Sequence, residues 1–283
     1  MNRIDKKFAE LKGKGEKALV GFITAGDPDM ERSLEIAKVL CSGGVDILEL
    51  GVPFSDPTAD GPVIQRSSMR ALRAGMTLDK AFDFVEKLRK DGIETPVILF
   101  SYYNPLFRYG SDRFYKKARS VGADGVLIVD LPPEEAREFT DGWDGWSPEA
   151  GIFSFIRLVA PTTPPERMKR ILKDASGFVY LISKTGVTGS EEILPSARQE
   201  SVRDPLDYGA IENMVSTIRS ITSVPVCVGF GVSTPDQARR ISLIADGVVI
   251  GSAFEKAIEE NMTSSELLEV LGRMATDFKR AMK

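Results

Sequence analysis

Two carboxylates close together in the chain are the side chains best suited to carry chemistry. Glu49 interrupts the apolar run 46–50, whose composition is typical of a buried strand. A buried carboxylate is costly, so a strand that carries one usually has a use for it. Asp60 follows in a loop rich in Pro, Ser and Asp, directly before Gly61-Pro62 and an amphipathic run. We therefore expect an acid–base pair at the end of this strand.

The chain contains no histidine. This excludes the commonest general base, any Ser-His or Cys-His nucleophile and the usual ligand of a catalytic zinc. Ile47 and Glu49 share one face of the strand, so in a barrel Glu49 would point into the mouth, where apolar surroundings raise its pKa toward neutrality. Two alternatives stay open: Glu49 is a buried charge paired with Lys or Arg, and Asp60 is only a helix N-cap.

Glycines at the ends of three expected strands form a candidate phosphate site. They lie in 186–189, 229–231 and 251–252, and the last pair opens a helix. Glycines let backbone N–H groups approach a ligand, and a helix N-terminus adds free donors and the positive end of its dipole. Each set alone would simply serve a turn. Three sets at adjacent strand ends favour phosphate, which barrels often bind after strands seven and eight.

Four aromatic residues also fall at expected strand ends: Phe22, Tyr102, Tyr180 and Phe230. Taken singly, each is more often part of a core. If all four face one mouth, they fit the flat apolar part of a substrate beside a phosphate.

Eight short apolar runs, each followed by a helical pattern, predict the architecture that positions these residues. The expected strands are 18–24, 46–50, 96–102, 125–129, 152–158, 178–183, 224–228 and 247–250. Such repeats predict an α/β fold, a parallel (β/α)8 TIM barrel with an extra N-terminal helix, and the absence of a linker predicts one domain over 1–283. The alternative, a doubly wound open sheet, lacks its glycine fingerprint after the first strand.

Local signals add helix starts and two unusual loops. Capped helix starts are expected at 163–166, 234–237 and 263–266. Segment 141–148 holds both tryptophans and should lie at the N-terminal face of the barrel. Segment 186–209 follows the sixth strand. A functional role is favoured for 185–189, whereas a working lid and a disordered loop are equally open interpretations for the far half.

Composition limits the possible partners. The net charge is −4, and no basic patch indicates nucleic acid. No apolar run is long enough for a membrane span, and the N-terminus does not resemble a secretory signal. The two cysteines, Cys41 and Cys227, fall in apolar patterns and are expected to be buried free thiols of a reducing, cytoplasmic protein.

The motifs together resemble the tryptophan synthase α-subunit family. The most specific is 48–65, LELGVPFSDPTADGPVIQ, and the others are 21–28, 102–105, 129–132, 186–189 and 229–231. The resemblance covers nearly the whole chain. It implies reverse-aldol cleavage of indole-3-glycerol phosphate to indole and glyceraldehyde 3-phosphate, without a cofactor. It also implies a β-subunit partner that carries pyridoxal phosphate, in an α2β2-type heterotetramer. Segments holding Pro53 to Thr58, Asn104 and Pro132 would face that partner.

The resemblance also implies residue roles. Glu49 would be the general acid–base, and Asp60 would hold the indole N–H. The residues implied to contact substrate are Phe22, Ile64 and Tyr102 at the indole, Gly189, Gly231, Gly251 and Ser252 at the phosphate, Tyr180 and Phe230 nearby, and Thr188, which would meet Asp60.

The chain departs from the family in its longer loop after Gly189, its tryptophan segment and its lack of histidine. Two other functions stay open. One is a Schiff-base aldolase acting on phosphosugars, because Lys184 ends the sixth strand. The other is a non-catalytic activator of a β-subunit partner.

Overall fold

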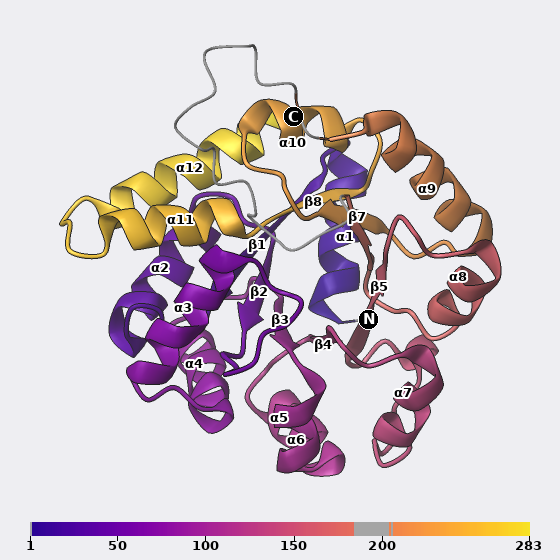
Figure 1. Cartoon of the computed structure of the whole chain (residues 1–283), viewed down its shortest axis with the longest axis horizontal. Coiled ribbons are helices and arrows are strands. Elements are labelled where there is room, and N and C mark those ends of the chain that lie inside the picture. Colours follow the sequence, from indigo (N-terminus) through magenta and orange to yellow (C-terminus); the bar gives the residue numbers. More distant parts are fainter. Residues whose placement is uncertain (1, 184–203, 205) are drawn as a thin grey trace.

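Eight parallel strands close into a barrel in which each strand pairs with the next along the chain and β8 pairs with β1 (Figure 1). This computed structural model describes residues 2–183, 204 and 206–283. The strands are β1 Ala18–Thr24, β2 Ile47–Gly51, β3 Val97–Ser101, β4 Gly125–Ile128, β5 Ser154–Val159, β6 Val179–Ile182, β7 Val226–Gly229 and β8 Gly247–Ile250. The predicted (β/α)8 barrel is confirmed, and the open-sheet alternative is wrong.

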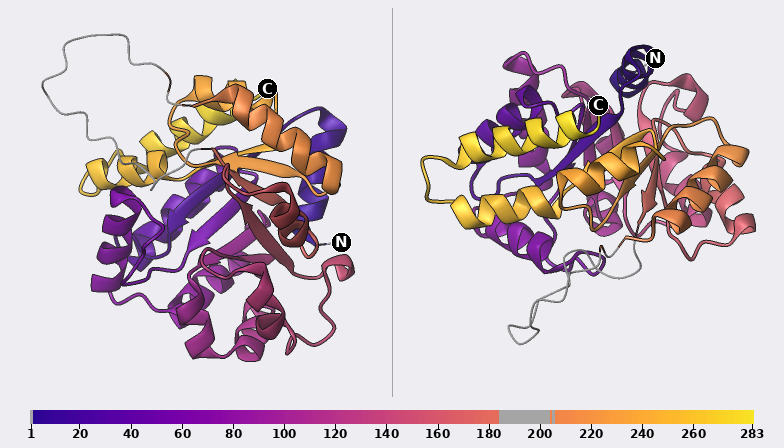
Figure 2. Two further views of the ribbon diagram at one scale, coloured as in Figure 1. Left: turned by 45° about the vertical axis from the view of Figure 1, so that its right-hand side comes forward. Right: turned by 90° about the horizontal axis from the view of Figure 1, so that it is seen from above.

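Helices surround the barrel as an outer ring (Figures 1 and 2). They are α2 Met30–Ser42, α3 Pro62–Arg73, α4 Leu78–Lys90, α5 Tyr103–Tyr109, α6 Ser111–Ser120, α7 Pro133–Thr140, α8 Pro165–Leu172, α9 Tyr208–Ile221, α10 Pro235–Ser242, α11 Ser252–Asn261 and α12 Leu267–Ala281. The expected leading helix is α1, Arg3–Lys14. Its buried residues Ile4, Phe8 and Leu11 pack in the same cluster as the barrel interior. Helix α1 therefore closes the N-terminal end and leaves the opposite mouth for a site.

Aspartates directly before β2, β4 and β8 fix the starts of the neighbouring strands β1, β3 and β7. Asp46 accepts a hydrogen bond from the Leu19 amide at 2.8 Å, Asp124 from Val97 at 2.9 Å and Asp246 from Val226 at 2.9 Å. The three carboxylates thus join β2 to β1, β4 to β3 and β8 to β7. Because a buried amide needs a partner, these bonds help to hold the strands in register.

Of the three predicted helix caps, the structure confirms one and differs at the other two. Thr234 and Gln237 form the expected capping box of α10. The start at 163–166 is wrong in detail, because α8 begins one residue later, with Pro164 at the N-cap, and Thr163 instead accepts from the Ala160 amide. The cap at 263–266 is also wrong, because Glu266 occupies the N-cap of α12 with no side-chain hydrogen bond. Helix α5 was not predicted.

The tryptophan segment lies between α7 and β5, at the N-terminal face as expected, and holds a short 3-10 turn, Pro148–Ala150. The Trp143 ring stacks on Tyr115 with centroids 4.8 Å apart, and its Nε1 donates to the Ser111 hydroxyl. The segment therefore packs onto α6. Most of 186–209 lies outside the described residues.

Within the described residues, no helix combines the length and apolar character needed to cross a membrane.

Candidate active site

Glu49 lies in the middle of β2 with its side chain inside the barrel. It is paired in register with Phe22 of β1 and Ile98 of β3, and only 1% of it is exposed. Among the described residues neither carboxylate oxygen has a hydrogen-bond partner. Burial raises its pKa to about 8, so the acid is mostly protonated at neutral pH. The alternative in which Glu49 pairs with Lys or Arg is therefore wrong for the described part of the chain.

Asp60 lies in the loop between β2 and α3. The Tyr102 hydroxyl donates to Asp60 Oδ2 at 3.0 Å and accepts from the Ala59 amide at 2.9 Å. Burial raises the pKa of Asp60 to about 6, and the Tyr102 hydrogen bond opposes this rise. The N-cap alternative is wrong, because Gly61 is the N-cap of α3. The Asp60 side chain instead accepts a hydrogen bond from Tyr102, which directly follows β3.

Glu49 and Asp60 line one cavity at the C-terminal mouth of the barrel. Its other lining residues are Phe22, Ile64, Phe100, Tyr180, Phe230, Gly231, Val232, Val249, Gly251 and Ser252. The cavity is narrow, about 40 Å³. Sequence reasoning missed Phe100, Val232 and Val249, although the inward alternation of β3 and β8 could have indicated Phe100 and Val249. Tyr102 is not part of this wall and reaches the site through Asp60.

Two glycines allow the aromatic rings to approach the strands. A Cβ at Gly51 would lie 2.6 Å from Cζ of Phe22, and a Cβ at Gly229 would collide with the Tyr180 hydroxyl. The two rings thus lie against the backbone of Gly51 and Gly229, where any other residue would place a Cβ in their way. Tyr180 also meets Phe230 edge-on, with centroids 5.7 Å apart. Together these rings form the apolar wall beside Glu49.

The polar end of the cavity is built from backbone. Phe230 and Gly231 both have positive φ, 71° and 88°. Helix α11 begins at Ser252 with Gly251 as its N-cap. The first amides of a helix have no partner within it, and the dipole makes this end positive, so this part of the cavity suits an anion.

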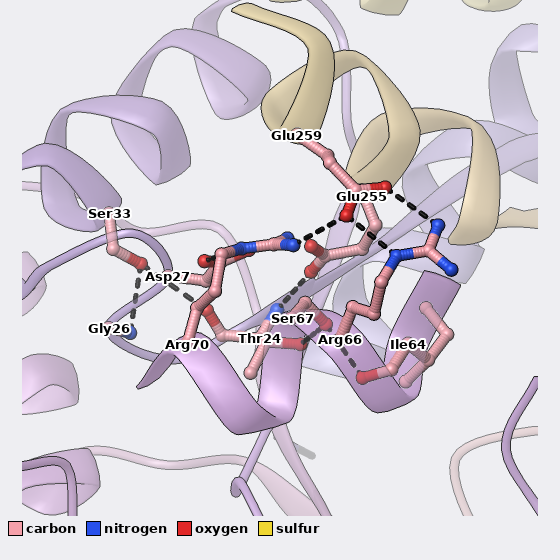
Figure 3. A network of polar contacts seen from close by, with 10 residues as sticks. All are labelled: Thr24, Gly26, Asp27, Ser33, Ile64, Arg66, Ser67, Arg70, Glu255 and Glu259. Carbon is pink, nitrogen blue, oxygen red and sulfur yellow. Dashed lines mark hydrogen bonds and ion pairs between the residues drawn. The ribbon is translucent and has the colours of Figure 1, made fainter. Parts of the chain in front are cut away.

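A buried network ties three walls of the site together (Figure 3). The Thr24 amide at the end of β1 donates to Glu255 of α11 at 2.5 Å. The Thr24 hydroxyl shares a 2.7 Å hydrogen bond with Ser67 of α3, which donates to the Ile64 carbonyl at 2.9 Å. Ile64 therefore has a fixed position relative to both β1 and the start of α11.

Ion pairs extend the same network. Arg70 of α3 binds both oxygens of Asp27 at 2.8 and 2.7 Å and reaches Glu259 of α11 at 2.8 Å. Burial, with the charge of Asp27 nearby, raises the pKa of Glu255 well above its usual value. When Glu255 is protonated it is neutral, so it can lie beside the negative charge of Asp27 without electrostatic repulsion. Sequence reasoning missed these residues, because their partners are far apart along the chain.

The structure thus brings together most of the expected site residues. Glu49, Asp60, Phe22, Ile64, Tyr180, Phe230, Gly231, Gly251 and Ser252 share one cavity, and Tyr102 binds Asp60. Thr188, Gly189 and Lys184 lie outside the described residues. Among the described residues, no group of three or more Cys, Asp or Glu side chains is arranged to hold a metal ion.

Comparison with known proteins gives a consistent result. A family model described as "Tryptophan synthase alpha chain" matches residues 8–283. The chain is 51% identical over 283 residues to the tryptophan synthase alpha chain of Desulfatibacillum aliphaticivorans, covering all of both chains. It is 52% identical, again over the whole of both, to that of Desulfosudis oleivorans.

Solved structures agree with these relatives. Tryptophan synthase subunit alpha from Legionella pneumophila superposes with a TM-score of 0.86 at 36% identity, over 100% of this chain and 98% of that one. Tryptophan synthase from M. tuberculosis in an aminoacrylate-bound form superposes with a TM-score of 0.83 at 29% identity, over all of both chains.

Proposed function

The chain belongs to the tryptophan synthase alpha chain family, and we propose that Glu49 and Asp60 perform its reaction in the cavity described above. It is a carbon–carbon lyase of tryptophan biosynthesis that cleaves indole-3-glycerol phosphate to indole and glyceraldehyde 3-phosphate. The observation that carries the assignment of residues is the carboxyl of Glu49, buried without a partner among the described residues and facing a cavity that Asp60 also lines.

The two carboxyl groups suit opposite roles. With pKa values of about 8 and about 6, Glu49 is mostly protonated and Asp60 mostly ionised at neutral pH. Glu49 can therefore donate its proton to the indole carbon that bears the glycerol chain. The ionised Asp60 accepts the hydrogen bond of the indole N–H and stabilises the positive charge that develops on the ring. Environments that separate two pKa values in this way commonly mark an acid and its counterpart.

The same Glu49 completes the cleavage. Once it has lost its proton, the carboxylate takes the proton of the glycerol hydroxyl next to the ring. The carbon–carbon bond then breaks, its electrons restore the aromatic indole, and the hydroxyl carbon becomes the aldehyde of glyceraldehyde 3-phosphate. Glu49 ends protonated as it began, so the balance needs no oxidant, reductant or cofactor from this chain.

Substrate orientation follows from the two ends of the cavity. The phosphate would bind the amides at Gly231, Gly251 and Ser252, and the indole would lie between Phe22, Ile64 and Tyr180.

We also propose the surroundings of the reaction. The family resemblance implies a β subunit that carries pyridoxal phosphate and receives indole, in an α2β2-type complex. Cys227 is buried as expected and Cys41 is only partly buried, and both are free thiols, which suits a reducing, cytoplasmic compartment.

Neither alternative is favoured by the family relationship. A Schiff-base mechanism needs a carbonyl for an amine to attack, whereas the glycerol chain of this substrate carries only hydroxyls. A non-catalytic activator would have no need of a buried Glu49 that lacks a partner among the described residues, because such a carboxyl lowers stability.

A single assay separates the three functions. Purified chain should release indole from indole-3-glycerol phosphate, and borohydride added with substrate should leave no covalent adduct. A trapped adduct on Lys184, found by peptide mass, would establish the Schiff-base mechanism. Absence of indole release, even with a β subunit present, would favour the activator.

A further inference from the structure

A second cavity lies far along the chain from the catalytic residues, on the outside of the barrel. It measures about 370 Å³ and is bounded by α7, the tryptophan segment and β5. Its deepest charged group is the guanidinium of Arg157, which is only 5% exposed. Arg157 also borders a further cavity of about 400 Å³ between the β4–α7 loop and α8. The guanidinium can thus be approached from either side.

Arg157 occupies a position that the fold would normally give to an apolar residue. Its neighbours Ile156 and Leu158 pack in the barrel interior, so Arg157 points to the opposite face, between the strand and the helices. It shares this face with the buried Phe155 and Val159. Replacing a buried charged side chain by an apolar one is often neutral or stabilising, so packing does not explain an arginine here.

One edge of the guanidinium lacks a hydrogen-bond partner among the described residues. Its Nε is sealed from solvent and has no hydrogen-bond partner among the described residues. Its carbon lies 3.9 Å from the centroid of the Phe155 ring, which supports the cation from one face. Burial lowers its pKa to about 10, although the nearby charge of Asp174 opposes this fall, and the group stays charged. A buried guanidinium in this state needs an oxyanion at its edge.

The rest of the wall limits what that anion is. Trp143 and Trp146 line the cavity, and both indole N–H groups are already bonded, to Ser111 at 2.8 Å and to the Phe153 carbonyl at 2.8 Å. They therefore offer apolar ring surface. The carboxylates of Asp141 and Asp174 on the same wall disfavour a doubly charged phosphate.

We propose that this cavity binds a small monoanionic carboxylate with an apolar body, with the carboxylate on Arg157 and the body against Trp143 and Trp146. Its volume lies within the usual range for small-molecule sites, ~300–1,000 Å³. The site is separate from the catalytic cavity, because the two share no lining residue.

The chain provides its own probe for this site. Its two tryptophans are the only ones in the sequence, and both line this cavity, whereas neither lines the catalytic one. The experiment titrates the full chain with 3-phenylpropionate and follows tryptophan fluorescence. Its neutral analogue 3-phenylpropanol and inorganic phosphate serve as comparison probes. We expect a saturable change with 3-phenylpropionate and at least about tenfold weaker binding of both other probes.

Substitutions identify the residue responsible. Arg157→Met should weaken 3-phenylpropionate binding at least about tenfold while keeping indole release and raising the unfolding temperature without ligand. Arg157→Lys should retain part of the affinity, because the charge stays but the planar fork is lost. A lack of response in the wild type, a response as strong to 3-phenylpropanol or to phosphate, or unchanged binding in Arg157→Met would each overturn the proposal. If Arg157→Met fails to fold, Arg157→Lys decides, since unchanged affinity there would also overturn it.

Discussion

At neutral pH the two site carboxyls carry different charges although both are buried, and a hydrogen bond to Asp60 contributes to the difference. Asp60 receives a hydrogen bond from Tyr102, whereas Glu49 has no partner among the described residues. A donor that favours the ionised form lowers the pKa and so opposes the effect of burial. Tyr102 therefore helps to keep Asp60 ionised at neutral pH.

Removing that hydroxyl should shift the pH profile of the enzyme. In Tyr102→Phe the pKa of Asp60 should rise above its value of about 6. Because the reaction needs ionised Asp60, the acidic limb of kcat/KM should move to higher pH, by roughly one unit. Tyr109→Phe is a matched control, since that hydroxyl bonds Asp79 away from the cavity. An acidic limb that stays in place or moves to lower pH would contradict the role of Tyr102.

Glu49 should lower stability at alkaline pH. Its pKa is raised from 4.5 to about 8 by folding, so between these values the folded state binds more protons than the unfolded one. Stability from this group is therefore full below about pH 4.5 and is lost as pH rises through about 8. Glu49→Gln should be more stable than wild type by about 3–5 kcal/mol near pH 9, with little difference near pH 4.

Denaturant unfolding at both pH values measures this effect. The exposed Glu212 provides the control, because Glu212→Gln should change stability little at either pH. A Glu49→Gln difference that does not depend on pH would show that the carboxyl is not a strained, buried acid.

At the scale of single residues the sequence predicts types better than environments. Glu49 was recognised because a carboxylate in an apolar run is unusual. For Asp60 the sequence predicts a role at the strand end but not its hydrogen bond, because nothing local shows that Tyr102 approaches it from another strand. Glu255 and Arg157 escaped notice because each sits in an ordinary amphipathic or strand pattern, and their burial depends on helices that pack far along the chain.

Among the elements, β-strand positions are the best predicted and helix starts the least. Apolar runs identify the strands because strands buried on both faces are nearly continuous in hydrophobicity. Capping depends on the dihedral angles of one residue, which tertiary packing can shift. The same Thr/Ser signal therefore marks a true cap at Thr234 and none at Thr263.

A pair of substitutions tests this distinction. Thr234→Ala removes the capping box of α10 and should cost about 1 kcal/mol of unfolding free energy. Thr263→Ala, at an exposed position beside α12, should stay within ~0.5 kcal/mol of wild type. Chemical denaturation gives both values. Equal losses of unfolding free energy in the two variants would mean that the hydrogen bonds of the capping box do not stabilise α10.

On the scale of the whole molecule, one face of the barrel mouth is suited to a partner. The loop 53–58, Asn104 and Pro132 follow β2, β3 and β4, which are neighbours in the barrel. Asn104 and Pro132 are exposed, and Phe107 on the same helix as Asn104 is 61% exposed. Aromatic residues are enriched at protein–protein interfaces.

This face should transmit activation by the β subunit. The loop 53–58 connects β2, which holds Glu49, to Asp60, so a partner that orders the loop should also order the catalytic pair. We expect a β subunit to raise indole release, and Asn104→Arg to abolish this increase while leaving basal activity unchanged. Glu212→Arg on α9 is the control and should keep it. Full activation of Asn104→Arg would place the partner elsewhere.

The most direct test of the mechanism is indole release from saturating indole-3-glycerol phosphate by Glu49→Gln, measured beside wild type with a β subunit present. Glutamine keeps the shape of the side chain but cannot transfer a proton. Turnover should fall by at least ~10²–10⁴-fold, the usual contribution of a general acid–base, with KM changed only a few-fold. Turnover within a few-fold of wild type would contradict the assignment of Glu49 as the proton donor and acceptor.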